Sequence, residues 1–376
     1  MYWREIMKKT SYLELGSLVI IQTVTTFFGI SISILKEDAG VNAWLSALIS
    51  YIIGFIPLLM VIFISNYKKD LNLHDKINNL FGNKIGFIIN IILSLLLVSL
   101  AITLLYNINN FILSQFLYRT PFIVSCTLFM LLIIYTTNKG INVITKMSLL
   151  LLVINIALYT INITSLIPNI DLNNFYPILK ENTDKILPGS IKISCINYLP
   201  LLTILIVPKN KLTVPKQYTK TIIISYIIGA IISFGLIITT FGVLGINLVN
   251  AFEYSEYIVL RKVKLLGFLE RIENIISLQW IIGTFVYLTI IIYTMSKSIP
   301  LKSIKSHKII NIIIGIILIA LTIFIFKDNT IFDNYIKNIF PYIMMGLIMI
   351  YILLIIKILI SKSKVNHHNN LIKEKT

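Results

Sequence analysis

Long apolar runs recur from one end of this chain to the other, and they constrain its fold more than any other feature. Runs of about 18 or more apolar residues are typical of transmembrane helices. Only 13% of the 376 residues are charged, about half the share that soluble globular domains carry. We therefore predict an all-α polytopic membrane protein with a single integral membrane domain over residues 1–376.

The apolar runs predict about ten transmembrane helices. Each run is long enough to cross a hydrocarbon core of about 30 Å at a rise of about 1.5 Å per residue, with some tilt. The expected spans cover residues 12–34, 42–65, 86–113, 121–137, 142–163, 189–207, 219–246, 274–296, 308–326 and 336–360. Residues 361–376 would then form a tail on the same side of the membrane as the N-terminus.

The net charge of +17 follows a topological pattern, so no nucleic-acid partner is expected. Lys and Arg concentrate in alternate segments between the runs, around Lys68, Lys139, Lys209 and Lys297. Segments of this kind face the cytoplasm, and both termini are therefore predicted to be cytoplasmic. The first apolar run continues without a small-residue cleavage site, so no removable signal peptide is expected.

The first expected span is interrupted near its middle. Residues 19–34 read "VIIQTVTTFFGISISI", in which hydroxyl and amide side chains precede Gly29. The sixth span carries a matching interruption, "PGSIKISCINYLP" at residues 188–200, where Pro200 removes a backbone donor and disturbs the preceding turn. Threonine and glycine also serve ordinary close packing of membrane helices, which is the alternative interpretation.

Matched interruptions in two halves of a chain indicate an inverted-repeat transporter fold with its binding site at the breaks. The halves would be residues 12–163 and 189–360, a five-plus-five repeat with broken helices one and six. Backbone groups freed by such breaks must face protein or a cavity. At a half-helix end they can hold a carboxylate or a cation.

The candidate ligand-binding residues come from spans one, three, six and eight. Spans one and six would hold the charged ends of a small ligand, and spans three and eight would form its side-chain pocket. Hydrogen bonding between helices is the alternative role for Asn107, and ordinary packing is the alternative for Trp280. The candidates are Gln22, Thr25, Thr26, Gly29, Asn107, Ser194, Asn197, Trp280 and Thr284.

Ionisable groups avoid the centres of the expected spans. We therefore predict no enzyme activity, no metal site and no cofactor. Lys146, in span five, is either a positive-inside residue or a fixed cation that replaces a coupling ion between spans one, five and eight. Lys192, in span six, either reaches the outer interface or lies beside an anionic ligand.

The outer loop over residues 247–273 shows apolar residues at roughly helical spacing between charged ones. It predicts a short surface helix that covers the outer face. The apolar positions are Tyr257, Val259, Leu260, Val263, Leu266 and Leu269.

Several short motifs occur in an order that is found in one known family. They are the polar first span around Gln22, "NAWLS" at 42–46, "RTP" at 119–121, "NIDLNNFYPIL" at 169–179, "FLERIE" at 268–273 and Trp280. With these motifs the sequence resembles the spore germinant-receptor B-subunit family, the spore permeases. That family is similar to the amino acid–polyamine–organocation transporters.

The resemblance implies a LeuT-like fold in the inner membrane of a bacterial spore. It implies a sensor for a small nutrient germinant, such as an amino acid, that assembles with A-type and C-type receptor subunits. Two alternatives stay open. One is an autonomous amino-acid permease of the same fold, and the other is a scaffold or channel-forming subunit without a ligand of its own.

Overall fold

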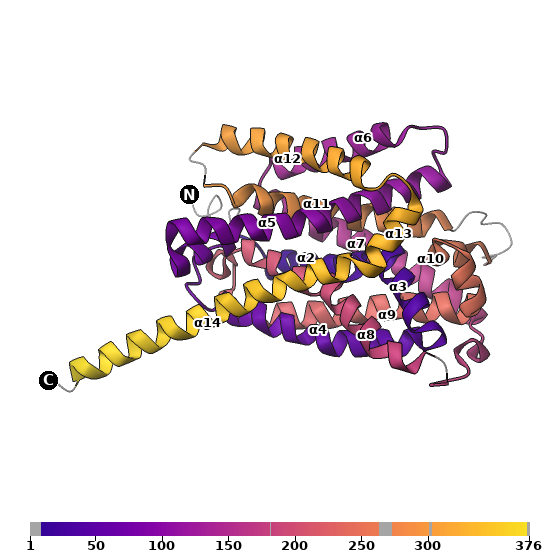
Figure 1. The fold of residues 1–376 in the computed structure, drawn as a ribbon, viewed down its shortest axis with the longest axis horizontal. Coiled ribbons are helices and arrows are strands. Elements are labelled where there is room, and N and C mark those ends of the chain that lie inside the picture. Colours follow the sequence, from indigo (N-terminus) through magenta and orange to yellow (C-terminus); the bar gives the residue numbers. More distant parts are fainter. Residues whose placement is uncertain (1–8, 181, 263–272, 301–302, 374–376) are drawn as a thin grey trace.

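The computed structural model describes residues 9–373 except 181, 263–272 and 301–302. Helices form nearly all of this part, and most of them run along one common direction (Figure 1). In chain order they are α2 (Tyr12–Thr25), α3 (Ile32–Asp38), α4 (Ala43–Ser65), α5 (Leu73–Gln115), α6 (Phe122–Thr137), α7 (Ile141–Leu166), α8 (Thr183–Asn197), α9 (Tyr218–Ala251), α10 (Ser255–Ile258), α11 (Glu273–Lys297), α12 (Ile304–Ile325), α13 (Asn329–Asn338) and α14 (Phe340–Lys373).

The helices confirm the predicted membrane architecture. Within the described residues, nine helical segments are long and apolar enough to cross a bilayer, and α6 is a shorter apolar helix of 16 residues. Several boundaries differ from the prediction. Helix α5 begins at Leu73 and α8 at Thr183, and α14 runs from Phe340 to Lys373, with α13 before it as a separate helix. The Asp328 carboxylate starts α13 by accepting the Ile331 N–H at 2.8 Å.

Helix α2 lies at the centre of the bundle and is almost wholly buried. It packs against α7, α9 and α11. Two threonines sit against glycines of these neighbours, Thr23 against Gly229 in α9 and Thr25 against Gly283 in α11. Membrane helices gain little from the hydrophobic effect when they associate, so this close approach of small residues carries much of the packing.

Both ends of the described chain lie at one end of the bundle. The Thr10 N–H donates to the Lys211 carbonyl at 3.0 Å, next to the loop that joins α8 to α9. Near the other terminus, the Lys362 ammonium lies 5.3 Å from the centre of the Phe63 ring at the end of α4. An even number of membrane crossings accounts for this placement.

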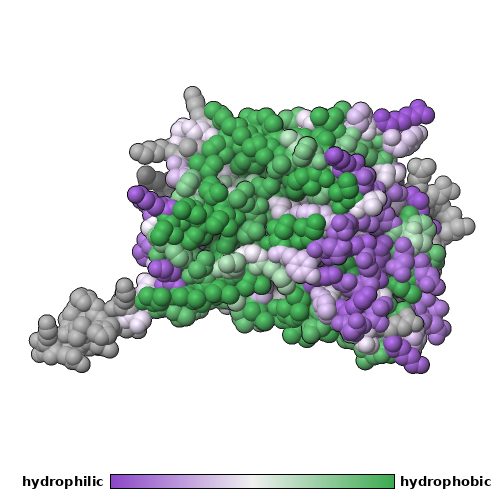
Figure 2. Space-filling model, in the orientation of Figure 1, coloured by the Kyte–Doolittle hydropathy of each residue, from purple (hydrophilic) through white to green (hydrophobic). Residues whose placement is uncertain are grey.

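The surface divides into an apolar belt and a polar end. In Figure 2, apolar side chains cover the middle of the molecule, and hydrophilic ones gather at the end where α3, α10 and α13 lie. An apolar belt of this kind matches the hydrocarbon core of a bilayer. The polar end lies opposite the two chain ends and covers the breaks in helices one and six.

Candidate functional site at the helix breaks

Helix one is broken where the sequence predicts. Regular helix stops at Thr25, and the backbone leaves helical geometry at Phe28 (φ −72°, ψ 117°) and Gly29 (φ 70°, ψ −27°) before α3 resumes at Ile32. The positive φ of Gly29 is a conformation that glycine adopts without the strain a side chain adds. The Ser31 N–H and hydroxyl both donate to the Thr26 carbonyl at 3.0 Å, and these bonds span the break.

The break frees two backbone groups, and side chains from distant segments satisfy both. The Gly29 N–H donates to Glu256 Oε1 at 2.5 Å. The Phe28 carbonyl accepts from Asn107 Nδ2 at 2.9 Å. Unpaired backbone groups cannot be left in a membrane interior, so Glu256 and Asn107 help to hold helix one in its broken form.

The aromatic rings of Trp280, Phe28 and Phe111 pack together at the break. A Cβ atom placed on Gly29 would lie 2.9 Å from the Trp280 ring and 2.6 Å from Asn107 Oδ1. The Trp280 ring stacks on Phe28, with centroids 5.7 Å apart, and lies 4.3 Å from the Phe111 centroid. The absence of a side chain at Gly29 therefore allows α5 and α11 to approach the break closely.

Helix six is broken at a matching position. Helix α8 ends at Asn197, and a tighter 3-10 helix over Leu199–Ile206 follows Tyr198. Pro200 lies in the first turn of that segment, where its missing N–H needs no partner. The Ser31 hydroxyl donates to Asn197 Oδ1 at 3.1 Å, which joins the two breaks directly.

Several buried polar atoms around the breaks have no hydrogen-bond partner within the described part of the chain. Five of them belong to predicted site residues, and each of these side chains is at most 1% exposed. They are Gln22 Nε2, Thr26 Oγ1, Asn107 Oδ1, Asn197 Nδ2 and Thr284 Oγ1. Buried polar groups are nearly always paired in folded proteins, so a cluster without partners indicates a place for a polar ligand.

Two other predicted site residues already have partners in the protein. The Thr25 hydroxyl donates to the Ile21 carbonyl at 2.7 Å, and its side chain packs on Gly283. The Ser194 hydroxyl donates to the carbonyls of Ser50 and Ser190 at 2.9 and 2.8 Å. In this structure Thr25 serves helix packing, and Ser194 ties α8 to α4.

The outer loop after α9 reaches further into the bundle than the sequence predicts. We call residues 252–258 the outer lid. Asn110 Nδ2 in α5 donates to Glu253 Oε1 at 3.0 Å and to the Tyr254 hydroxyl at 2.6 Å. The Lys36 ammonium donates to the Phe252 carbonyl at 2.9 Å. These bonds hold the outer lid over the break in helix one.

The prediction of a helix lying on the outer surface is therefore wrong for the start of this loop. Ser255, Glu256 and Tyr257 are all buried, and α10 is only four residues long. Val263, Leu266 and Leu269 lie outside the described residues. The apolar positions near Tyr257 did signal burial, but spacing alone could not indicate that Glu256 faces the break.

The buried carboxyl of Glu256 is a weaker acid than an exposed glutamate. Burial raises its pKa from the ordinary value to about 7, and the bond from the Gly29 N–H and the charge of Lys36 oppose the shift. A carboxyl with this pKa changes its charge near neutral pH. No sequence signal pointed to it, because it lies between the predicted spans.

Neither of the two candidate lysines, Lys146 and Lys192, lies at the breaks. Lys146 is exposed on α7, so the structure does not place it between α2, α7 and α11. Hydroxyls fill that contact instead, with Ser17 Oγ and Ser148 Oγ 2.6 Å apart. Lys192 forms an ion pair with Asp38 at 2.8 Å, which links α8 to the end of α3.

The chain was compared with protein-family models and with known proteins. Residues 11–333 match the model of a family described as spore germination protein, the spore permeases. The chain belongs to this family. Among curated spore germination proteins, it is 23% identical to protein XB of Bacillus anthracis over 93% of this chain and 96% of that one. It is also 23% identical to protein KB of Bacillus subtilis (strain 168), over 68% and 69% of the two chains.

Solved structures show the fold of this spore germination protein. A Na⁺-coupled sialic acid symporter, solved in a substrate-bound outward-open state, aligns with a TM-score of 0.63 and 15% identity over 92% of this chain and 79% of that one. A manganese transporter of Eremococcus coleocola aligns with a TM-score of 0.55 and 12% identity over 94% and 79%. The spore germination protein therefore has the predicted LeuT-like architecture with broken helices one and six.

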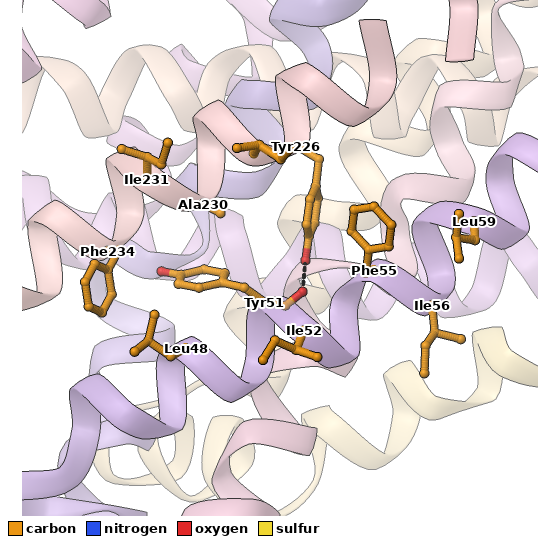
Figure 3. Close-up of a pocket in the computed structure, with 11 residues that line it drawn as sticks. Leu48, Tyr51, Ile52, Phe55, Ile56, Leu59, Tyr226, Ala230, Ile231 and Phe234 are labelled. Carbon is orange, nitrogen blue, oxygen red and sulfur yellow. Dashed lines mark hydrogen bonds between the residues drawn. The ribbon is translucent and has the colours of Figure 1, made fainter. Parts of the chain in front are cut away.

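This spore germination protein has an apolar groove of about 570 Å³ between α4 and α9. Its Tyr51 ring packs on Phe27 and Tyr198 at the two breaks, with centroids 6.0 and 6.3 Å apart. Figure 3 shows Tyr51, Phe55 and Tyr226 along it, with the Tyr226 hydroxyl donating to the Tyr51 carbonyl at 2.6 Å. Ile52 and Ile231 at its edge are 74% and 66% exposed. The groove faces the apolar belt, where lipid chains lie.

Proposed function

We propose that this spore germination protein is a transporter-like sensor subunit of a germination receptor. It binds a small germinant, such as an amino acid, between the breaks of helices one and six and the helices α5 and α11. The observation that carries the proposal is the set of buried polar atoms that have no partner among the described residues, on Gln22, Thr26, Asn107, Asn197 and Thr284. Their number and variety suit a ligand with both donors and acceptors.

The closed arrangement around the breaks suits a sensor. Gln22, Thr26, Asn107 and Thr284 are nearly inaccessible to solvent, so a ligand must enter through another conformation of the same chain. A ligand shifts such an equilibrium only by binding one state more tightly than the other. Binding at the breaks would favour the closed state. The larger fraction of closed molecules would then be the signal.

The proposed location is the inner membrane of a bacterial spore, with both chain ends in the cytoplasm. Lys68, Lys69, Lys209 and Lys211 lie at the end of the bundle where the chain ends also lie, which supports that orientation. We further propose that A-type and C-type receptor subunits are its protein partners, because the family and its relatives act in spore germination.

Two threonine substitutions test the binding site. Thr26→Val and Thr284→Val remove hydroxyls without partners and keep the side-chain shape. Spores would carry each variant with its partner subunits, and loss of optical density would be followed against the concentration of each amino acid. We expect the half-saturating concentration of the amino acid to rise about fivefold to tenfold, because each substitution removes one hydrogen bond to the ligand.

Thr23→Val is the matched control. It makes the same change on the same helix, but the Thr23 hydroxyl donates to the Val19 carbonyl and its side chain faces Gly229. An unchanged concentration dependence in Thr26→Val and Thr284→Val would contradict the binding site. Robust uptake of labelled amino acid by the purified protein alone in liposomes would instead favour an autonomous permease.

A further inference from the structure

No described residue forms an ion pair with the Glu256 carboxylate at the break, although the charge of Lys36 acts on it. Its side chain is fully buried. The hydrogen bonds that it accepts within the described part of the chain come from neutral groups, the Gly29 N–H at 2.5 Å and the Ser255 hydroxyl at 3.4 Å. The nearby Lys36 ammonium donates to the carbonyls of Val249 and Phe252 instead. Burying a carboxylate is costly unless a cation pairs with it.

The Asn107 amide presents a second acceptor at the same place. Its nitrogen donates to the Phe28 carbonyl at 2.9 Å. A carbonyl can only accept, so this bond fixes the amide orientation and leaves Oδ1 facing Gly29. Oδ1 would lie 2.6 Å from a Cβ on Gly29, it is buried, and it has no donor among the described residues.

The edge of an aromatic ring completes the surroundings of Gly29. Trp280 Cη2 lies 2.9 Å from the same Cβ position, and the ring stacks on Phe28. The centroids of Trp280 and of Tyr254 in the outer lid are 5.4 Å apart. A carboxylate, an amide oxygen and the edge of an indole ring therefore surround one glycine.

We propose that the amino group of the ligand binds beside Gly29, where Glu256 and Asn107 Oδ1 accept its hydrogens. The inference deepens the proposed function and rests on it. Glu256 and Asn107 then determine specificity, and the site selects primary amines, including amino acids with a free ammonium group. Because Glu256 belongs to the outer lid, an amine bound there also holds the lid over the break.

This assignment reverses the usual use of a half-helix N-terminus, which favours an anionic group of the ligand. In this chain Glu256 already takes the Gly29 N–H. A ligand carboxylate at the same point would meet a like charge. The ligand carboxylate, where one is present, must lie elsewhere in the site.

The test compares ligands that differ only in their charged ends. The probes are L-alanine, L-valine and L-phenylalanine, together with the amines and the carboxylic acids that remain when the carboxyl or the amino group is removed. Binding to the purified full-length chain is followed by thermal shift and by calorimetry. We expect the wild-type chain to bind an amino acid and its amine but not the matching acid.

Glu256→Gln and Glu253→Gln form a matched pair of variants. Glu256→Gln keeps an acceptor for the Gly29 N–H, so the outer lid keeps its contact, but it removes the charge. Amine affinity should fall on the order of tenfold or more in this variant. Glu253→Gln removes a charge three residues away, where Asn110 and Asn329 bind the side chain, and it should leave amine affinity unchanged.

Two results would overturn the inference alone. Tighter binding of the carboxylic acids by Glu256→Gln would mean that a ligand carboxylate displaces Glu256 from Gly29. Equal amine binding by Glu256→Gln and wild type would mean that Glu256 does not recognise the ligand, while the proposed function stands. Failure of every probe to bind the wild-type chain would overturn the inference together with the proposed function.

Discussion

At the scale of single residues, Gly29 decides the geometry of the site in two ways. Its φ of 70° belongs to a region that L residues rarely adopt, and its missing side chain admits Asn107 and Trp280. The backbone turn exposes one N–H, and the space beside it holds the groups that surround a ligand. The positive φ and the close approach of Asn107 and Trp280 therefore both favour glycine at position 29.

Gly29→Ala should destabilise the protein and weaken ligand binding together. The added Cβ meets Asn107 and Trp280 at less than 3 Å, and the positive φ adds roughly 1–2 kcal/mol of strain. Thermal unfolding in detergent and amino-acid binding would measure both effects. Gly82→Ala is the control, because Gly82 also has a positive φ of 78° but no atoms near its Cβ position. An equal loss of stability in both variants would show that packing at Gly29 contributes nothing.

At the scale of elements, two short contacts hold the outer halves of the broken helices together. The Ser31 hydroxyl reaches Asn197 across the breaks. Nearer the outer end, Lys192 in α8 pairs with Asp38 at the end of α3. These contacts make α3 and α8 one unit above the site, and the outer lid packs beside it.

The Lys192–Asp38 pair should stabilise that unit measurably. Both side chains are more than four-fifths buried, so their attraction is screened less than that of a surface pair. A double-mutant cycle with Lys192→Gln and Asp38→Asn should give a coupling free energy of about 1 kcal/mol in thermal unfolding. The matched cycle at Lys337 and the more exposed Glu37 should give less. Additive effects of Lys192→Gln and Asp38→Asn would contradict the prediction.

At the scale of the whole molecule, the outer lid closes the bundle over the break in helix one. The outer end is polar and holds a cleft of about 520 Å³ above the outer lid, with Lys36, Glu37, Glu253 and Asp333 on its walls. On the face that Figure 2 shows, apolar side chains cover the part of the bundle next to this polar end. A water-soluble ligand would meet this cleft first, and the outer lid lies between it and the site.

The pH dependence of stability should report the closed state. The pKa of Glu256 in the folded chain is about 7, above its ordinary value, so the folded state holds a proton that the unfolded state releases. The contribution of Glu256 to stability is therefore fully present below the ordinary pKa of a glutamate, and it is lost as pH rises to about 7, by on the order of 3 kcal/mol. Among the described residues, Lys36 and Tyr254 are titratable groups that interact with Glu256. Thermal unfolding between about pH 5 and pH 8 measures the slope.

Glu256→Gln is the control for this slope. The amide resembles the protonated acid, so the variant should be more stable than wild type at the upper end of the pH range. Some slope should remain, because burial also raises the pKa of Glu253. Parallel curves for wild type and variant would contradict the assignment of the slope to Glu256.

Much of the fold could be predicted from the sequence, because its causes are local. Apolar runs of sufficient length have to span a bilayer as helices, and the distribution of Lys and Arg between them indicates their orientation across the membrane. Gly29 and Pro200 mark the two breaks in the chain itself. Gln22 and Thr26 were candidates from the interruption in span one, and Asn107 and Thr284 from polar positions in spans three and eight. The structure buries all four.

The tertiary structure alone decided how the freed groups are satisfied. A broken helix must find a partner for its N–H, but nothing local states which one, and Glu256 lies 227 positions away along the chain. The rotation of α7 likewise turned Lys146 outward and Ser148 inward, which loose helical periodicity did not predict. The sequence by itself determined where the chain breaks within the membrane. The packing of distant segments determined which charge lies beside the break, because electrostatic partners are set by distance in space rather than by position in sequence.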